Sequence, residues 1–331
     1  MAVLSRVARF VNSLRLLQDD DSNRPAKEPA ASPPNLLDPK ALAQVGQLEL
    51  ISTNVVDGFL SGKHRSSHKG GCTDFSEHRP YTKGDEIRMI DWRAFAKSDR
   101  YYVKQFDNET NLQALMIVDT SGSMGFGMST PTKLNYAQMA CACLSRLLLR
   151  QRDSVGLAVV DRQVRRFVPP QLRASHLQLI FDVLRTVQPE GTTRLDGPIL
   201  EAARRLKRKG MVILFSDCFG DIPKLTASLQ QLRSRGHDVL VFQVLAPEEL
   251  AFRFRRPSRF EDLENVGQRL NVNPGIVRKQ YLERLERFMD ELKHSLTRIG
   301  CDHEVLRTDQ DLGASLSLYL RRRAATKRSR R

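Results

Sequence analysis

The chain reads LQALMIVDTSGS over residues 112–123, and this stretch decides the fold class. Its apolar run ends at Asp119, and a continuous run of this length is typical of a parallel strand that is buried on both faces. Residues 133–150 follow with apolar side chains at helical spacing. The later chain predicts further strands and helices in alternation: strands at 155–160, 164–168, 211–216, 238–245 and 303–306, and helices at 176–187, 195–209, 223–235, 280–299 and up to about Tyr319. This alternation predicts an α/β fold with a doubly wound, mainly parallel sheet.

Length and composition restrict the class of protein. The chain has 331 residues, of which 40% are hydrophobic and 27% charged, and its formal net charge is +15. This composition excludes a wholly disordered chain, and no unbroken apolar run reaches the ~18 residues that span a membrane. Seven of the positive charges lie in the last eleven residues, so the other 320 residues carry only +8.

Composition shifts predict four parts along the chain. Residues 1–38 form an N-terminal amphipathic segment followed by a disordered, proline-rich linker, and residues 39–110 form a polar module that starts with a short helix at 39–54. Residues 111–320 hold the α/β domain, and residues 321–331 form a basic, disordered tail. The first 18 residues contain arginines and no acid, with apolar side chains at helical spacing. They fit a helix that docks on the protein itself, a helix that contacts a membrane surface, or an organellar presequence.

Five cysteines are scattered along the chain without CxxC spacing. Reduced, partly buried thiols are typical of cytosolic proteins, so we expect a cytoplasmic protein. A membrane-surface helix in the first 18 residues would make it peripheral to the membrane.

Polar side chains stand in three loops of the predicted fold. In α/β sheets, functional residues lie beyond the carboxyl ends of the strands. Asp119, Ser121 and Ser123 come directly after the first strand, and Asp217 follows the strand at 211–216. Thr192 and Thr193 stand in the loop before the helix at 195–209. Carboxylate and hydroxyl oxygens of this kind suit Mg²⁺ or Mn²⁺. The alternative is that Asp119 and Ser121 only cap the turn.

This arrangement resembles the von Willebrand factor A domain and its metal-ion-dependent adhesion site. The DxSxS motif of that family falls on Asp119, Ser121 and Ser123, its second-loop threonine best matches Thr193, with Thr192 one register away, and its third-loop aspartate falls on Asp217. The resemblance implies that the hydroxyls bind the metal directly, that the aspartates often act through water, and that an acidic side chain of a protein partner completes the metal's shell.

A second resemblance lies upstream, where Tyr81, Gly84, Asp85, Arg88, Ile90, Asp91 and Trp92 form the pattern YxxGDxxRxIDW. Residues 70–236 look like the bacterial and archaeal family catalogued as domain of unknown function 58. Two positions depart from that family, the segment AFAKS at 94–98 and Asp161, which we interpret as a turn residue. The resemblance implies a non-catalytic adaptor that works with a MoxR-type AAA+ ATPase in assembling or remodelling other proteins.

The upstream motif itself has two interpretations. Trp92, the only tryptophan of the chain, can pack the module onto the sheet while Asp85 pairs with Arg88. Alternatively, Asp85, Arg88, Asp91 and Trp92 bind a partner.

Other functions find less support in the sequence. Residues 122–129 resemble a phosphate-binding loop, but Met128 replaces its lysine, and neither Ser121 nor Ser123 lies in a GxSxG elbow. A metal-dependent hydrolase is therefore the weaker alternative. The basic run RRLKRK at 204–209 and the tail fit nucleic acid or an anionic surface through phosphate neutralisation, but no aromatic residues interleave with them, so we do not favour nucleic acid as the partner.

Overall fold

The computed structural model describes residues 14–17, 52, 69–82, 85, 90–107, 112–128, 131–252, 254, 258–264 and 269–329. The chain divides into two compact units, of which one is Leu60–Asn111 and the other combines Met1–Phe59 with Leu112–Arg331. Each unit is described by itself.

The smaller unit is an antiparallel pair of strands with one short helix. Its elements are β2 (Lys69–Pro80), α3 (Trp92–Ser98) and β3 (Tyr102–Asp107). Asp91 begins α3 by accepting hydrogen bonds from the amides of Arg93 and Ala94, at 2.9 and 3.2 Å. Phe95 of α3 stacks on Tyr101 with 4.5 Å between the ring centroids, and this contact attaches the helix to the strand pair.

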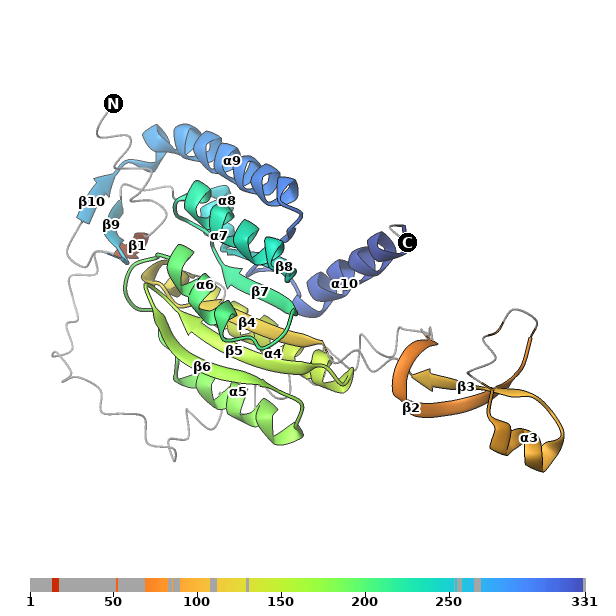
Figure 1. The fold of residues 1–331 in the computed structure, drawn as a ribbon. Coiled ribbons are helices and arrows are strands. Elements are labelled where there is room, and N and C mark those ends of the chain that lie inside the picture. Colours follow the sequence, from red (N-terminus) through yellow and green to blue (C-terminus); the bar gives the residue numbers. More distant parts are fainter. Residues whose placement is uncertain are drawn as a thin grey trace. The chain divides into compact units, whose positions relative to one another are not determined.

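The larger unit is built on a six-stranded sheet with the order β11-β8-β7-β4-β5-β6 (Figure 1). All neighbours are parallel except β5 and β6, which are antiparallel. The strands are β4 (Gln113–Asp119), β5 (Ser154–Val160), β6 (Val164–Gln171), β7 (Met211–Ser216), β8 (Asp238–Leu245) and β11 (Asp302–Arg307). The predicted α/β fold with a mainly parallel sheet is confirmed.

Helices cover both faces of this sheet. They are η2 (Gly122–Gly125), a 3₁₀ turn, and α4 (Lys133–Arg150), α5 (Ala174–Thr186), α6 (Asp196–Arg204), α7 (Ile222–Ser234), α8 (Pro247–Ala251), α9 (Pro274–Arg298) and α10 (Leu312–Ser329). Leu115 and Ile117 of the central strand share one hydrophobic core with α6, α7 and α9. The opposite face carries α4 and α10, since Tyr319 packs edge-on against Phe242 of β8 and Tyr136 of α4 donates to the backbone of the turn before α10.

Local signals in the sequence explain where several helices begin. Thr132 caps α4 by accepting from the amide of Asn135, and Asp221 caps α7 in the same way from Lys224. Asn273 precedes Pro274, which stands at the first position of α9, where its missing N–H costs nothing. These caps fix the loops that leave the sheet and so help to position the site described below.

Three short elements of the larger unit were not predicted, namely α8, β9 (Ser258–Asp262) and β10 (Arg269–Val272). The last two form a three-stranded antiparallel sheet with β1 (Leu14–Leu17), in the order β1-β9-β10. The prediction of a helix over the first 18 residues is therefore wrong for Leu14–Leu17, because pairing with β9 overrides the local helical spacing. The rest of that segment, the linker and the helix predicted at 39–54 fall outside the described residues, apart from Ser52, which is assigned as helical.

Two element ends also differ from the prediction. Helix α10 continues to Ser329, so the predicted helix end near Tyr319 is wrong. The prediction of a disordered tail at 321–331 is wrong for residues 321–329. Alanine, lysine and arginine are good helix formers, and no glycine or proline stops the helix there. Strand β6 continues through Pro169 and Pro170, which an edge strand tolerates because one side of its backbone needs no partner. Within the described residues, none of the helices combines the length and the apolar character that crossing a bilayer requires.

Candidate metal centre

Asp119, Ser121 and Ser123 lie together where β4 leaves the sheet, and all three side chains are fully buried. The Asp119 carboxylate accepts from the Ser121 amide at 2.9 Å and from the Ser216 hydroxyl, at the end of β7, at 2.6 Å. The hydroxyls of Ser121 and Ser123 are 3.2 Å apart. The DxSxS segment therefore presents two neighbouring hydroxyls beside a carboxylate that the next strand holds in place.

The loop before α6 is joined to this segment by its backbone. The amide of Glu190 donates to the carbonyl of Thr120, and the amide of Gly122 donates to the carbonyl of Gly191, each at 2.8 Å. Gly191 has a φ of +78°, a conformation that favours glycine. This backbone connection brings the two following threonines to the edge of the sheet.

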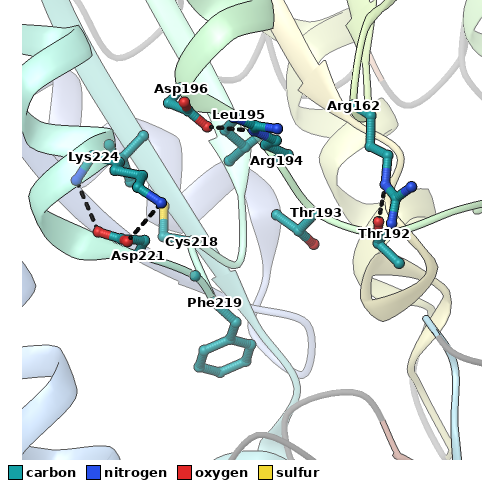
Figure 2. A pocket seen from close by; sticks show the side chains of 12 residues that line it. Arg162, Thr192, Thr193, Arg194, Leu195, Asp196, Cys218, Phe219, Asp221 and Lys224 are labelled. Atoms are coloured by element: carbon teal, nitrogen blue, oxygen red, sulfur yellow. Dashed lines mark hydrogen bonds and ion pairs between the residues drawn. The ribbon is translucent and has the colours of Figure 1, made fainter.

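The two threonines point to different partners. The Thr192 hydroxyl accepts from the guanidinium of Arg162 (Figure 2), whereas the Thr193 hydroxyl donates to the carboxylate of Glu264. Glu264 also hydrogen-bonds with Ser123. Thr193, and not Thr192, therefore shares a neighbour with the DxSxS hydroxyls, as the preferred register predicted. Binding of a metal by these residues stays a prediction.

Asp217 is also fully buried and has a partner on each oxygen. One oxygen accepts from the Phe219 amide at 3.1 Å, and the other is 2.8 Å from the ammonium of Lys133. Lys133 is itself fully buried and also lies 2.6 Å from Glu249 of α8. Because both of its oxygens are occupied, Asp217 suits contact with a metal through water.

The electrostatics of the site are dominated by buried carboxylates. Burial and the neighbouring Asp217 raise the pKa of Asp119 to about 7, although hydrogen bonds from Ser216 and Ser121 lower it. Burial lowers the pKa of Lys133, but the charges of Asp217 and Glu249 outweigh this effect and raise it above its ordinary value. A charged Lys133 therefore neutralises part of the charge of Asp217 and Glu249. The hydrogen-bond partners of Asp119 described above, Ser121 and Ser216, are neutral.

This donor set fits a hard divalent cation. Two serine hydroxyls, a threonine hydroxyl and two aspartates supply oxygen atoms, and a cation would oppose both effects that raise the pKa of Asp119, its burial and the charge of Asp217. Among the described residues, no three His, Cys, Asp or Glu side chains are grouped so as to hold a metal by themselves.

The sequence reasoning missed three residues of this site: Lys133, Glu249 and Glu264. Lys133 is the first residue of the helix predicted at 133–150, but nothing in its spacing indicated burial. Glu249 lies 116 residues from Lys133, and Glu264 lies 71 residues from Thr193. Contacts of this range follow from the fold and have no local signal.

A cavity of about 480 Å³ lies beside the site, and Thr193, Cys218 and Phe219 are among its lining residues. Three basic side chains also line it (Figure 2). Arg194 pairs with Asp196 at 3.6 Å, Lys224 pairs with Asp221 at 3.3 Å, and Arg162 donates to Thr192. The lining of the cavity therefore carries three basic and two acidic side chains next to the predicted metal ligands.

The upstream motif residues lie in the smaller unit, and most have structural partners there. Asp85 accepts from the amide and the hydroxyl of Thr82, each at 2.9 Å, and Asp91 caps α3. Trp92 is 56% exposed and meets Phe95 edge-on. Arg88 lies outside the described residues. The predicted partner-binding role of this group stays a prediction, with Trp92 as its exposed member.

Asp161, the other departure from the family pattern, is a turn residue as interpreted. Its carboxylate accepts from the amide of Gln163 at 2.9 Å and from the guanidinium of Arg165 at 2.6 Å.

Comparison with known proteins gives relatives along most of the chain. An uncharacterised protein of Mycobacterium tuberculosis, Rv1480, is 26% identical over 313 residues, which cover 91% of this chain and 98% of the relative. An uncharacterised protein of Mycobacterium bovis, Mb1516, matches to the same extent.

Solved structures with a similar fold include BatB of Bacteroides thetaiotaomicron, with 16% identity, a TM-score of 0.44, and coverage of 65% of this chain and 99% of that one. An aerotolerance-related membrane protein of Bacteroides fragilis has 17% identity and a TM-score of 0.44, covering 63% and 97%. The VWA domain of SpRpn10 has 9% identity and a TM-score of 0.39, covering 62% and 94%.

A family model described as "Protein of unknown function DUF58" matches residues 77–291, which is well over half of the chain and spans both the upstream motif and the DxSxS site. The chain therefore belongs to the DUF58 family.

Proposed function

We propose that this protein is a non-catalytic, metal-dependent protein-binding module. Ser121, Ser123 and Thr193 hold Mg²⁺ or Mn²⁺ directly, and Asp119 and Asp217 hold it through water. Because most of the direct ligands are neutral, the ion keeps enough positive charge to accept a carboxylate from a protein partner.

The observation that carries this proposal is the convergence of three chain segments on one point. The DxSxS segment, Thr193 and Asp217 come from separate loops, yet Ser216 beside Asp217 bonds Asp119, and Glu264 connects Thr193 with Ser123. A role for Asp119 and Ser121 as turn caps alone does not account for Thr193 and Asp217 at the same place.

The lining of the cavity supports an acidic partner. It carries three basic side chains, Arg162, Arg194 and Lys224, against the two acidic ones that pair with Arg194 and Lys224, so a peptide that places one carboxylate on the metal meets an excess of one positive charge. Such complementarity increases the rate of association more than the final affinity.

The partner that we propose is a MoxR-type AAA+ ATPase, with this protein acting as an adaptor in assembling or remodelling other proteins. The support for this partner is the family resemblance. The cavity beside Thr193 is the surface that would bind the residues flanking the partner's carboxylate. We assign no catalytic residue in this proposal.

Co-purification tests the proposed interaction. A tagged chain from its source cells should retain the ATPase in Mg²⁺ and release it in EDTA, and Ser121→Ala should release it in both buffers. Ser234→Ala is the matched control, since the exposed Ser234 hydroxyl donates only to the backbone of α7 and should leave retention unchanged. Retention that is indifferent to EDTA and to Ser121→Ala would overturn the metal-dependent mechanism.

A further inference from the structure

The segment after β9 reaches the candidate metal centre. Leu263 and Glu264 follow Ser258–Asp262 directly, and Glu264 accepts a hydrogen bond from the Thr193 hydroxyl. The same carboxylate hydrogen-bonds with Ser123. Two of the three hydroxyls assigned to the metal therefore face a carboxylate of this chain.

The backbone of this segment also fits closely on the DxSxS loop. A Cβ atom on Gly122 would lie 2.2 Å from the carbonyl oxygen of Leu263 and 2.8 Å from its carbonyl carbon. Real Cβ atoms do not approach backbone this closely, so only glycine at position 122 lets Leu263 lie where it does. This contact is independent of the Glu264 hydrogen bonds and places the segment against the same loop.

We propose that Glu264 is an internal ligand of the metal centre, which occupies the position that the partner's acidic side chain must take. This inference rests on the proposed function. A tethered carboxylate has an effective concentration of the order of millimolar, so a partner must displace it before binding. Glu264 directly follows Leu263, which lies against the DxSxS loop, and then competes with the partner for this position.

Mn²⁺ alone is the probe that tests this inference. Water-proton relaxation of the full chain with Mn²⁺ counts the exchangeable waters on the bound ion. Glu264→Gln should add one water to that count and weaken Mn²⁺ binding by about tenfold, the scale typical of losing a group that supports a metal site. Gly122→Ala, which displaces Leu263, should also add one water. Glu190→Gln is the matched control, because it removes an exposed charge from the loop that carries Thr193 and should change neither quantity.

The outcomes separate the two proposals. If the wild-type chain binds no Mn²⁺, both the metal centre and the internal ligand are overturned. If the wild-type chain binds Mn²⁺, Asp119→Ala loses it, and Glu264→Gln leaves the water count and the affinity unchanged, the metal centre stands and the role of Glu264 is overturned.

Discussion

Lys133 is the residue that links the candidate site to the stability of the fold. Its ammonium is fully buried between Asp217 and Glu249 and lies 5.0 Å from the centroid of the Phe219 ring. A buried charge of this kind is tolerated only because its partners are in place, and removing it leaves two buried carboxylates without their cation.

Lys133→Met should therefore lower the free energy of unfolding by about 3–5 kcal/mol, the range measured when one member of a buried ion pair is removed. Urea denaturation measures this change. Lys224→Met is the control, since its side chain is 63% exposed and pairs with Asp221 at the surface, where the expected loss is below about 1 kcal/mol. Equal stability of the two variants would contradict the buried role of Lys133.

The two adjacent threonines offer a second comparison at this scale. Thr193→Val should weaken Mg²⁺ binding at least about tenfold, because it deletes a hydroxyl assigned to the metal, while Thr192→Val should leave binding unchanged. A fluorescence-detected thermal shift with increasing Mg²⁺ measures both. The opposite ranking would move the ligand to Thr192, although its hydroxyl accepts from Arg162.

At the scale of elements, the edge strand β11 is connected to the site through side chains. The Nε2 atom of His303 on β11 lies 3.2 Å from the side-chain Oε1 atom of Gln243 on β8. The side-chain Nε2 of Gln243 in turn donates to the backbone carbonyl of Asp217 at 3.2 Å. Burial, followed by the charge of Lys293, lowers the pKa of His303 to about 4. The histidine is therefore neutral in the folded protein at physiological pH.

This shift predicts how stability depends on pH. The unfolded chain takes up a proton at His303 near pH 6.5, whereas the folded chain takes it up only near pH 4. The free energy of unfolding that His303 contributes is therefore lost as the pH falls between these values. In His303→Gln this part of the acid sensitivity should disappear, as measured by urea denaturation at pH 7 and pH 5. His294→Gln, at an exposed position of α9, should keep the acid sensitivity of the wild type. An unchanged pH dependence in His303→Gln would contradict the assignment.

A further prediction concerns the part of helix α10 that follows Leu320. Leu312, Leu316 and Tyr319 are buried, and all three lie before position 320. Truncation after Leu320 should therefore leave both the melting temperature and Mg²⁺ binding close to those of the full chain. Circular dichroism during heating measures the first, and a large fall would show that residues 321–329 stabilise the fold.

The sequence predicted the elements that have strong local patterns. The buried strands are apolar along their length, and the long helices α4 and α9 repeat apolar side chains at helical spacing. In contrast, β9 and β10 are only five and four residues long and mix charged with apolar side chains. Asp119, Ser121, Ser123, Thr193 and Asp217 could be predicted because they follow strands or precede a helix at one edge of the sheet. Glu264 could not, because it directly follows β9, one of the short elements that were not predicted.

For the whole molecule, the net charge of +15 does not reveal the site. Seven of these charges lie beyond position 320, while the candidate centre combines neutral hydroxyls with buried carboxylates. The interaction that we propose therefore depends on a single carboxylate contact on a metal, with the charged lining of the cavity in a supporting role. The DUF58 match covers residues of both the candidate centre and the smaller unit, which carries the exposed Trp92.

The proposed function depends on the binding of one divalent cation at the DxSxS centre, and titration calorimetry of the purified full chain with Mg²⁺ measures this binding. We expect saturable binding of one Mg²⁺ per chain, and no binding heat for an Asp119→Ala variant that remains folded by circular dichroism. No binding by the wild-type chain, or equal binding by the Asp119→Ala variant, would contradict the proposed function.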